Sequence, residues 1–504
     1  MIKKIHLLAI ISLLAVYSLT GCENMPGTAE EKKPMTITDN TIETAIAKEF
    51  EAYPYISEDS IEVEVDNYIV TLSGSTDNIL EKEKATDLAS MIRGVDAVVN
   101  LVDVDCKMVE DQELREKIEY ALSADPVLEA YKIIVKVDSG IVSLHGALDS
   151  WHQTQLAGDV VKKITGVRKV NNNIAFAYDE DRAGVEIKED IESLMRNDIR
   201  IESGLIDIEI EKGTVILSGK VGSAAEKSLA IVHAYAEGVD SVIAEDLEVS
   251  HEARDPLLRK DKYIEKTNLE IINAIQKAFL QDPRLLNHDI EVEVDDGKVT
   301  LTGTVSNLRA KNAAEEDARN VVGVWGVKNN ITVEPMEFDI PEKVADNVRV
   351  AMESHPLFED YTIVAESDDE GKVTLEGRVH YYFEKEQAEE LASKVYGVAE
   401  IQNKIDVTEG LAAPIDVTPA RPDLPVIRKP QIKSDEQLLD DVNYQLWWSP
   451  WVDRNQVDVA VEDGKVTLSG TVNSTMEMRH AVKNAYEGGA FEVDNNLRVD
   501  FWEM

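Results

Sequence analysis

The sequence predicts an α+β fold, built as a tandem array of six small α-β-β-α-β domains that each have a three-stranded sheet and two helices. The stretch DGKVTLTGTV at 296–305 returns as DGKVTLSGTV at 463–472, and four looser copies precede or separate these two. Within each copy the spacing of apolar residues changes from four to two. A glycine also recurs at one place in every copy: Gly74, Gly146, Gly219, Gly303, Gly377 and Gly470. Shared landmarks at a fixed period indicate a repeat array.

Each repeat is expected to open with a helix of about three or four turns. Apolar residues step by four ahead of the shared glycine, as in Ile271, Ile275 and Phe279, so that they line one helix face. Proline then follows in five copies. It is expected to end the helix, because it lacks the N–H that a helix needs and disfavours a helical residue before it. These residues are Pro54, Pro126, Pro283, Pro356 and Pro450. The third copy has Ile199 there instead.

A β-hairpin is expected after the proline. Apolar and acidic residues alternate at 61–65 (IEVEV), 206–210 (IDIEI) and 290–294 (IEVEV), as in a strand with one solvent-exposed face. A tight turn with Asp-Gly or its equivalent follows and is the signature of a hairpin. The shared glycine closes the second strand, where it is expected to permit a bend or a positive φ.

A second helix and a third strand complete the unit. In the fourth copy the helix is expected at 310–322, with Gly323 as its C-cap, and the strand NITVE at 330–334. A helical crossover allows this strand to pair in parallel with the hairpin. Two helices on one face of a three-stranded sheet then form a small two-layer domain.

The array is predicted to contain six repeats and two connecting segments. Repeats 1 to 6 are placed at 36–106, 109–179, 184–250, 265–335, 339–408 and 434–502. A short linker covers 251–264. The second linker, 409–433, is rich in proline and is expected to be extended and semi-rigid.

The repeat resembles the BON domain family, named for bacterial OsmY and nodulation proteins. The likeness rests on the α-β-β-α-β order, the pattern G-x-V-x-L-x-G and the later glycine, and it covers nearly the whole mature chain as six copies. The third copy lacks the proline, and the last has GGAF at 488–491 where the others have Gly-Val. The resemblance implies an envelope protein associated with osmotic stress, outer-membrane integrity and interaction with phospholipid or other envelope proteins.

The first 21 residues are expected to be a lipoprotein signal peptide. Lys3 and Lys4 precede an apolar run at 7–19 that is too short to span a membrane. The run ends in LTGC, which resembles the lipobox of bacterial lipoproteins and implies that Cys22 carries the acyl chains of the mature protein. Several acyl chains would anchor it stably. Glu23 favours the outer membrane, facing the periplasm.

Cys106 is the other cysteine of the chain, so no intrachain disulfide is expected once Cys22 carries lipid. It lies in VVNLVDVDC, where it shares one strand face with Val102 and Val104. We expect a small, half-buried apolar residue at the edge of the repeat. An intermolecular disulfide is the alternative.

Composition and motifs argue against several classes of function. The net charge of −45, from 97 acidic and 52 basic side chains, repels nucleic acid and anionic headgroups over about 8–10 Å. The histidines after the signal peptide never fall at metal-ligand spacing. Nucleophile elbows, phosphate-binding glycine loops and EF-hand loops are not found. We therefore expect no catalytic residues, no metal and no cofactor.

The sixth repeat carries an unusual aromatic stretch, LWWSPWVD, at 446–453. Other copies have mostly small or polar residues at the positions of Trp447 and Trp448, which suggests an exposed helix end. Two tryptophans there would form an apolar patch of the kind that marks a partner or membrane interface. Local packing within repeat 6 is the alternative, and Trp451 is expected in the core.

These expectations combine into a non-enzymatic, lipid-anchored envelope protein whose tandem modules bind phospholipid membrane or envelope partners. The family resemblance implies a role in osmotic-stress tolerance and outer-membrane integrity. The alternative is a periplasmic protein-interaction scaffold or stabiliser, with no lipid binding beyond its acyl anchor. The identity of the ligand, the packing of the repeats and the oligomeric state stay open.

Overall fold

The structure is a computed structural model that describes residues 36–499, apart from 52, 54–55, 57–59, 179–181, 251–265, 287, 335–339, 359–360, 380–381, 408–432 and 491. The predicted signal peptide, Cys22 and nearly all of the two linkers lie outside the described residues. The described residues from Ile37 onward belong to one compact unit.

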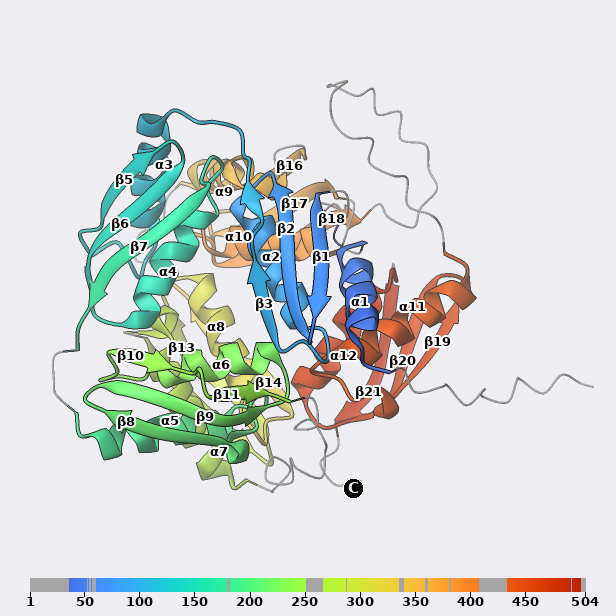
Figure 1. The fold of residues 1–504 in the computed structure, drawn as a ribbon. Helices are drawn as coiled ribbons and strands as arrows, with labels where there is room; N and C mark the ends of the chain where they lie inside the picture. The colour runs from blue at the N-terminus through green and yellow to red at the C-terminus, as the bar shows by residue number, and fades with distance from the viewer. Residues whose placement is uncertain are drawn as a thin grey trace, which may run out of the picture. The chain divides into compact units, whose positions relative to one another are not determined.

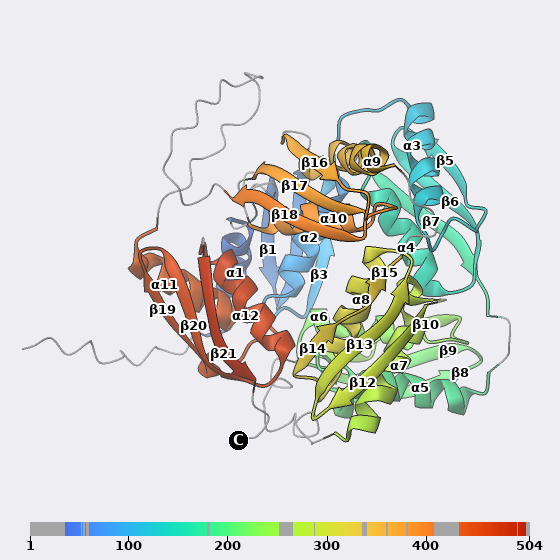
Figure 2. The same cartoon turned by 180° about the vertical axis from the view of Figure 1, so that it is seen from behind.

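Each repeat has the predicted α-β-β-α-β order, which confirms the fold class (Figure 1). The second strand of the hairpin is central in every sheet. In repeat 6, for example, the first strand pairs with it antiparallel and the last strand pairs with it parallel on the other side. The two helices lie against one face of the sheet, as the view of repeat 4 in Figure 2 shows. The opposite sheet face is open.

The first three repeats contain the following elements. Repeat 1 has α1 (Asp39–Glu51), β1 (Ile61–Asp66), β2 (Ile69–Thr76), α2 (Ile79–Ser90), β3 (Ala97–Asn100) and β4 (Asp103–Val104). Repeat 2 has α3 (Asp111–Ala124), β5 (Ile134–Asp138), β6 (Ile141–Leu148), α4 (Trp151–Lys162) and β7 (Lys169–Phe176). Repeat 3 has α5 (Gly184–Asn197), the 3₁₀ turn η1 (Ser203–Leu205), β8 (Ile206–Glu211), β9 (Thr214–Val221), α6 (Ala224–Ala234), β10 (Ser241–Ile243) and β11 (Leu247–Val249).

The last three repeats follow the same order. Repeat 4 has α7 (Asn268–Gln281), η4 (Pro283–Leu285), β12 (Asp289–Asp295), β13 (Lys298–Val305), α8 (Leu308–Arg319), β14 (Gly326–Asn329) and β15 (Thr332–Val333). Repeat 5 has α9 (Pro341–Ser354), η5 (Pro356–Phe358), β16 (Ile363–Ser367), β17 (Lys372–Val379), α10 (Tyr382–Ser393) and β18 (Glu400–Val407). Repeat 6 has α11 (Asp435–Trp448), η6 (Arg454–Gln456), β19 (Val457–Glu462), β20 (Lys465–Val472), α12 (Thr475–Glu487) and β21 (Glu492–Val499).

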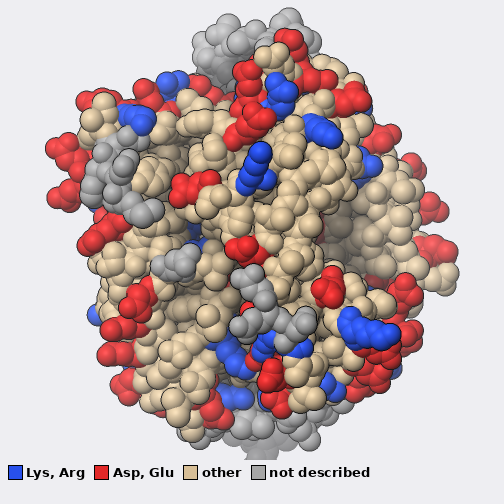
Figure 3. All heavy atoms as spheres, turned by 90° about the vertical axis from the view of Figure 1, so that its left-hand side faces the viewer, with Lys and Arg blue, Asp and Glu red and all other residues tan. Residues whose placement is uncertain are grey.

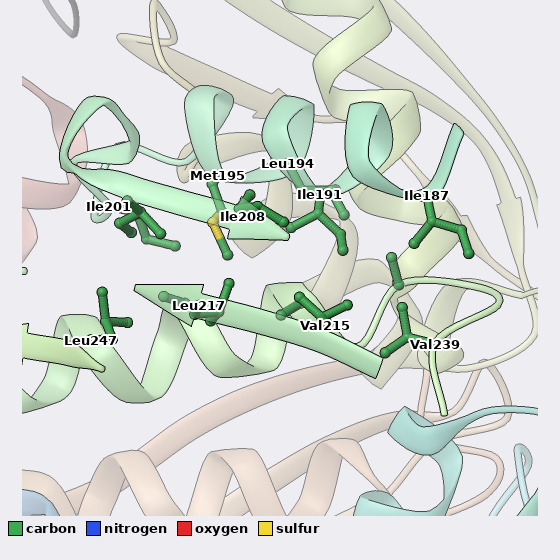
Figure 4. Packing of buried hydrophobic residues seen from close by; sticks show 14 of the residues in the cluster. Ile187, Ile191, Leu194, Met195, Ile201, Ile208, Val215, Leu217, Val239 and Leu247 are labelled. Atoms are coloured by element: carbon green, nitrogen blue, oxygen red, sulfur yellow. The ribbon is translucent and has the colours of Figure 1, made fainter. Parts of the chain in front are cut away.

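In repeats 2 to 6 the apolar row on the first helix forms part of the core of its own repeat, and the core of repeat 5 also includes Leu308 of repeat 4. Figure 4 shows repeat 3, where Ile187, Ile191 and Met195 of α5 lie opposite Val215 and Leu217 of β9. All five side chains are buried. Burial of each such side chain stabilises the folded state by about 1.5–3 kcal/mol. The spacing of four in the sequence thus predicted both the helix and its buried face.

The first helix ends in a side-chain turn just before the proline position. Asp125 and Asp282 each accept a hydrogen bond from the backbone N–H two residues on, at 2.9 and 2.8 Å. Asp198 does the same in repeat 3, where Ile199 replaces the proline. Asp favours such turns because its short carboxylate reaches the nearby backbone. This turn therefore ends the helix whether or not proline follows.

The shared hairpin glycine is required by a close approach of the backbone. Gly303 has a φ of +125°, and a Cβ built on it would lie 2.4 Å from the carbonyl oxygen of Asp289. No side chain fits that gap, and L-residues disfavour this φ. The expectation for this glycine is confirmed.

Two details of the second half of the repeat differ from expectation. Helix α8 spans 308–319 rather than 310–322, so Gly323 is not its C-cap. Gly323 instead lies in the turn that follows, with a φ of +89° and the side chain of Ile271 close by. In repeats 1, 3 and 4 the last strand is also divided into two short segments that pair with the same central strand.

An asparagine ties the last strand to the second helix. Asn100 donates a hydrogen bond through Nδ2 to the Lys82 carbonyl at 2.7 Å, and its Oδ1 accepts the N–H of Val102. The same pair of bonds recurs in repeats 2, 4 and 5. The bond to Oδ1 gives a partner to a backbone N–H of the last strand, and the Nδ2 bond holds that strand against a carbonyl inside the second helix.

Candidate functional site

The tryptophan pair of repeat 6 lies in the last turn of α11. Trp448 is 2% exposed, and Trp447 is half-buried with its ring centroid 4.7 Å from that of Trp448. The expectation of an exposed helix end is therefore wrong for Trp448. The Trp448 ring lies beside Tyr444 and Trp447 of its own helix. Repeat 1 meets this helix end, because the backbone N–H of Arg93 donates to the Trp448 carbonyl at 3.1 Å. The guanidinium of Arg93 also lies 5.2 Å from the centre of the Trp447 ring.

Charged and aromatic groups extend this contact between repeats 1 and 6. Lys48 forms an ion pair with Asp441 at 2.5 Å and lies 4.1 Å from the centre of the Tyr444 ring. The Tyr53 hydroxyl donates to a carboxylate oxygen of Glu487 at 2.5 Å. A cation held against an aromatic face and a carboxylate gains from both. The tryptophan pair thus serves an interaction inside the chain.

Glu49 is a buried carboxyl in the same contact, with 7% of its surface exposed. Burial raises its pKa to about 8, and the negative charge of Glu487 adds to the effect. Gln445 and Lys483 oppose the shift without cancelling it. The side chain is therefore mostly protonated at neutral pH, which removes the cost of burying a charge here.

The backbone bond between Arg93 and Trp448 recurs in two other pairs of repeats. Thr165 donates its N–H to the Ser354 carbonyl at 3.4 Å, and its hydroxyl does so at 3.0 Å. Val322 donates its N–H to the Asn197 carbonyl at 2.8 Å. Each acceptor is the last residue of a first helix, and each donor directly precedes the downstream glycine. One contact therefore joins repeats 1 and 6, 2 and 5, and 3 and 4.

This contact uses atoms that a helix leaves unpaired. The last four carbonyls of an α-helix have no partner within the helix. Docking the turn of another repeat against the helix end supplies an N–H to one of them. We define these three contacts as the helix-end contacts.

Repeats 3 and 4 share a second backbone bond that explains the missing proline. The Ile199 N–H donates to the Asn320 carbonyl at 2.9 Å, and Asp198 and Val321 form an antiparallel bridge between the two bonds. Proline has no N–H and could not make this bond. The absence of proline from repeat 3 is thus the feature of the sequence that indicates this contact.

Further contacts join repeats of different pairs. Arg309 of repeat 4 forms a largely buried ion pair with Asp125 of repeat 2 at 2.6 Å. Trp151 of repeat 2 stacks on Tyr235 of repeat 3, with centroids 4.1 Å apart. Such contacts show that the repeats pack together rather than hang as separate beads.

The charged residues around Asp198 have a structural role. Asp198 is 6% exposed, and it pairs with Arg200 and with His233 Nε2, each at 2.7 Å. Burial alone would raise its pKa, but Arg200 and His233 overcome that effect and hold the pKa far below its usual range. A carboxylate held this firmly by two partners is a poor base, and no nucleophile is part of the cluster.

The described part of the chain offers no metal site or membrane span. No group of three or more His, Cys, Asp or Glu residues within it is placed to hold a metal ion. No helix among the described residues is both long and apolar enough to cross a membrane.

Cys106 is buried beside Ile79 and Val104, and Val170 of repeat 2 packs against this small cluster. Burial also raises the pKa of its thiol. Cys106 thus packs as a small apolar residue, as in the first of the two expectations for it. Trp451 is half-buried, with its ring 5.9 Å from that of His480, so it lies at the margin of the core.

Several functional residues of the contacts were not predicted. Lys48, Glu49 and Arg93 belong to a contact that joins residues far apart in the sequence, and nothing local marks them. The shared glycines, which were predicted, have a structural role in the hairpins.

Comparison with known proteins supports the repeat assignment. A family model described as BON domain matches residues 38–106, 110–178, 184–250, 267–335, 342–409 and 434–500. The chain is similar to Osmotically-inducible protein Y of Escherichia coli (strain K12), with 27% identity over 143 residues, which cover 27% of this chain and 71% of that protein.

Two solved structures of CdsD, a structural protein of the type III secretion system of Chlamydia trachomatis, also match. The first is 16% identical, covers 46% of this chain and 96% of its own, and has a TM-score of 0.13. The second, a C-terminal domain, is 16% identical, covers 45% and 100%, and has a TM-score of 0.12. Scores this low carry no weight for the fold.

Proposed function

Since the chain belongs to the BON domain family, with six copies of the domain in tandem, we propose that it is a non-enzymatic interaction protein of the bacterial cell envelope. The similarity to an osmotically-inducible protein supports a role in osmotic-stress tolerance. The sequence LTGC supports a lipid anchor on Cys22, and Glu23 supports an outer-membrane position that faces the periplasm. Such an anchor would place all six repeats at the membrane surface.

The observation that carries this proposal is the orientation of the repeats. In the helix-end contacts, helix ends meet the turns after the second helices, while the open sheet faces are exposed. On these faces the first strand of each hairpin carries polar side chains, such as Glu62 and Glu64 in repeat 1 and Glu291 and Glu293 in repeat 4. In the face that Figure 3 shows, acidic side chains lie mostly toward the margins, with uncharged surface between them. Surfaces of this kind suit binding without turnover.

Two classes of partner are compatible with this arrangement. The burial of Trp448 removes half of the apolar patch on which membrane contact would depend, and this favours a protein-interaction scaffold. Phospholipid binding is the second candidate. It is supported by Trp447, whose half-buried indole beside Arg93 has the amphipathic character of residues at membrane interfaces.

Vesicle flotation separates the two candidates. Residues 23–504, made without lipid, are mixed with vesicles of phosphatidylethanolamine and phosphatidylglycerol, alongside the Trp447→Ala variant. A scaffold stays in solution at all salt concentrations. A phospholipid-binding protein floats, more so as salt screens its charge, and loses this ability with Trp447→Ala.

A growth assay tests the envelope role itself. A strain that lacks the gene is challenged with high osmolarity and complemented with the intact chain or with Cys22→Ser. We expect the intact chain to restore growth and Cys22→Ser to restore it poorly. Equal growth of the strain with and without the gene would contradict the proposed role.

A further inference from the structure

The open sheet face of repeat 1 carries an exposed apolar patch. Tyr68, Ile69, Val99 and Leu101 are 37%, 43%, 43% and 61% exposed. Ile69 pairs with Ala97 in the parallel register of β2 and β3, and Val99 stands two residues further along the same face. Leu101 follows two residues later. We define these four residues as the repeat 1 patch.

The patch is peculiar to the first repeat. At the position of Leu101 the sheet registers of the other repeats place Asn173, Asp246, Asn330, Lys404 and Asn496. At the position of Val99 they place Asn171, Ile243, Lys328, Gln402 and Asp494. At the position of Ile69 they place Ile141, Thr214, Lys298, Lys372 and Lys465. A face that is mostly polar in five copies is thus apolar in one.

Tyr68 is held in a conformation that disfavours a side chain. Its φ is +65°, in the left-handed region. The other five repeats have glycine at this place in the hairpin: Gly140, Gly213, Gly297, Gly371 and Gly464. A Cβ on Gly371, for instance, would lie 2.4 Å from a backbone oxygen.

The turn itself does not need the tyrosine ring. The Tyr68 N–H donates to Asp39 at 2.9 Å, and the Gly464 N–H donates to Asp435 in the same way at 2.8 Å. Glycine therefore supplies the backbone bond equally well. A strained and exposed aromatic residue points to a use for its side chain.

Acidic side chains border the patch along β1. Glu64 stands opposite Thr71, and Asp66 stands opposite Ile69, on the same sheet face as the patch. Both carboxylates are exposed. This border repels anionic headgroups, and the net charge of −45 disfavours a second copy of the chain. Positive groups beside an apolar surface would be complementary to it.

We propose that the repeat 1 patch binds an amphipathic protein segment whose apolar stripe is flanked by lysine or arginine. The stripe covers Ile69, Val99 and Leu101, the ring of Tyr68 packs against its end, and the basic side chains meet Glu64 and Asp66. The inference rests on the proposed function, because it names the class of partner for one surface of an interaction protein.

Binding of two model peptides tests the proposal. Both are fluorescent helical peptides of equal length with the same leucine stripe, one flanked by lysine and the other by glutamate. Fluorescence anisotropy with residues 23–504 should show binding of the lysine peptide only, and added salt should weaken it. Leu101→Asn, which copies repeats 2, 4 and 6, should weaken binding by about tenfold. The control Leu269→Asn, at a 65% exposed leucine of repeat 4, should leave it unchanged.

Tyr68→Gly provides a second and independent test. Glycine relieves the strained φ, so the thermal midpoint of repeat 1 should rise while the affinity for the lysine peptide falls. Unchanged affinity would overturn the role of Tyr68. Equal binding of both peptides, or no effect of Leu101→Asn, would overturn the proposal.

A membrane partner would give a different pattern. If Leu101→Asn abolished flotation with vesicles and left peptide binding unchanged, the patch would be a lipid contact and the proposal would be wrong. The osmotic growth assay is independent of these results, so failure of the patch is distinguishable from failure of the proposed function.

Discussion

The helix-end contact between repeats 3 and 4 and the one between repeats 1 and 6 share a backbone hydrogen bond but differ in the groups around it. Between repeats 3 and 4, two backbone bonds run in opposite directions, from Val322 to Asn197 and from Ile199 to Asn320. Between repeats 1 and 6, Pro450 occupies the place of Ile199 and has no N–H to donate. The bond from Arg93 to Trp448 is kept, and aromatic rings and charges surround it.

The difference shows how a repeat array can give its copies distinct partners. A shared backbone bond sets the geometry but cannot tell one copy from another. Side chains around it can, since the tryptophan pair occurs in repeat 6 and the proline is absent from repeat 3. We infer that partner choice within the chain depends on these departures from the common pattern.

Replacing Trp448 by alanine is expected to have the largest effect. Removing a large, 2% exposed aromatic side chain should lower the free energy of unfolding of repeats 1 and 6 by about 3–5 kcal/mol. Guanidinium unfolding of the intact chain would show an earlier first transition. Trp447, which is half-buried and contacts Arg93, should give a smaller loss when replaced by alanine. Equal losses would show that the deeper burial of Trp448 is not the cause.

Ile199→Pro tests the backbone bond between repeats 3 and 4. It removes the N–H that Asn320 accepts, so a loss of about 1–2 kcal/mol is expected. Ile199→Ala keeps the N–H and controls for the side chain. If both variants lose the same stability in guanidinium unfolding, the bond contributes nothing and the comparison fails.

His355 makes the contact of repeats 2 and 5 sensitive to acid. Burial, assisted by the charges of Lys163 and Lys394, lowers its pKa from 6.5 to about 4. Between these values the unfolded chain binds a proton that the folded chain does not. Stability therefore falls as pH drops from 6.5 to 4, by at most about 1.4 kcal/mol per pH unit. His355→Asn can keep the turn and should flatten this slope, with little change at pH 7.5. An unchanged slope would refute this account of His355.

Lys48→Ala should have the smallest effect. Its ion pair with Asp441 and its contact with Tyr444 are partly exposed, so a loss of about 0.5–1 kcal/mol is expected. Lys372→Ala, which breaks an exposed pair with Glu400 inside repeat 5, should cost less. A larger loss for Lys372→Ala would contradict the importance of charges between repeats.

Much of the repeat fold could be predicted because its determinants are local. The step of four from Ile271 to Phe279 predicts a helix and its buried face, and the alternation at 290–294 predicts a strand. Gly303 marks a close backbone approach that its neighbours in the sequence imply. The boundary at Gly323 was wrong because the glycine serves a turn after the helix, and a pattern of residues does not distinguish the two roles.

The contacts between repeats were beyond prediction for a physical reason. The helix-end contacts join a backbone carbonyl to a backbone N–H. Every residue has the first and every residue except proline has the second, so the side chains give little indication of where these contacts form. Trp448 was expected at the surface because equivalent residues are small or polar, yet its side chain is buried. Ile199 carried a usable signal, since a missing proline restores an N–H.

Amide hydrogen exchange at Arg93 tests the central claim, that specific repeats dock through their helix ends. The intact chain is compared with one that ends after residue 407 and so lacks repeat 6. We expect slow exchange of the Arg93 amide in the intact chain and an increase of about a hundredfold or more without repeat 6, while Thr165 and Val322 stay protected. Equal exchange of Arg93 in the two chains would contradict the claim.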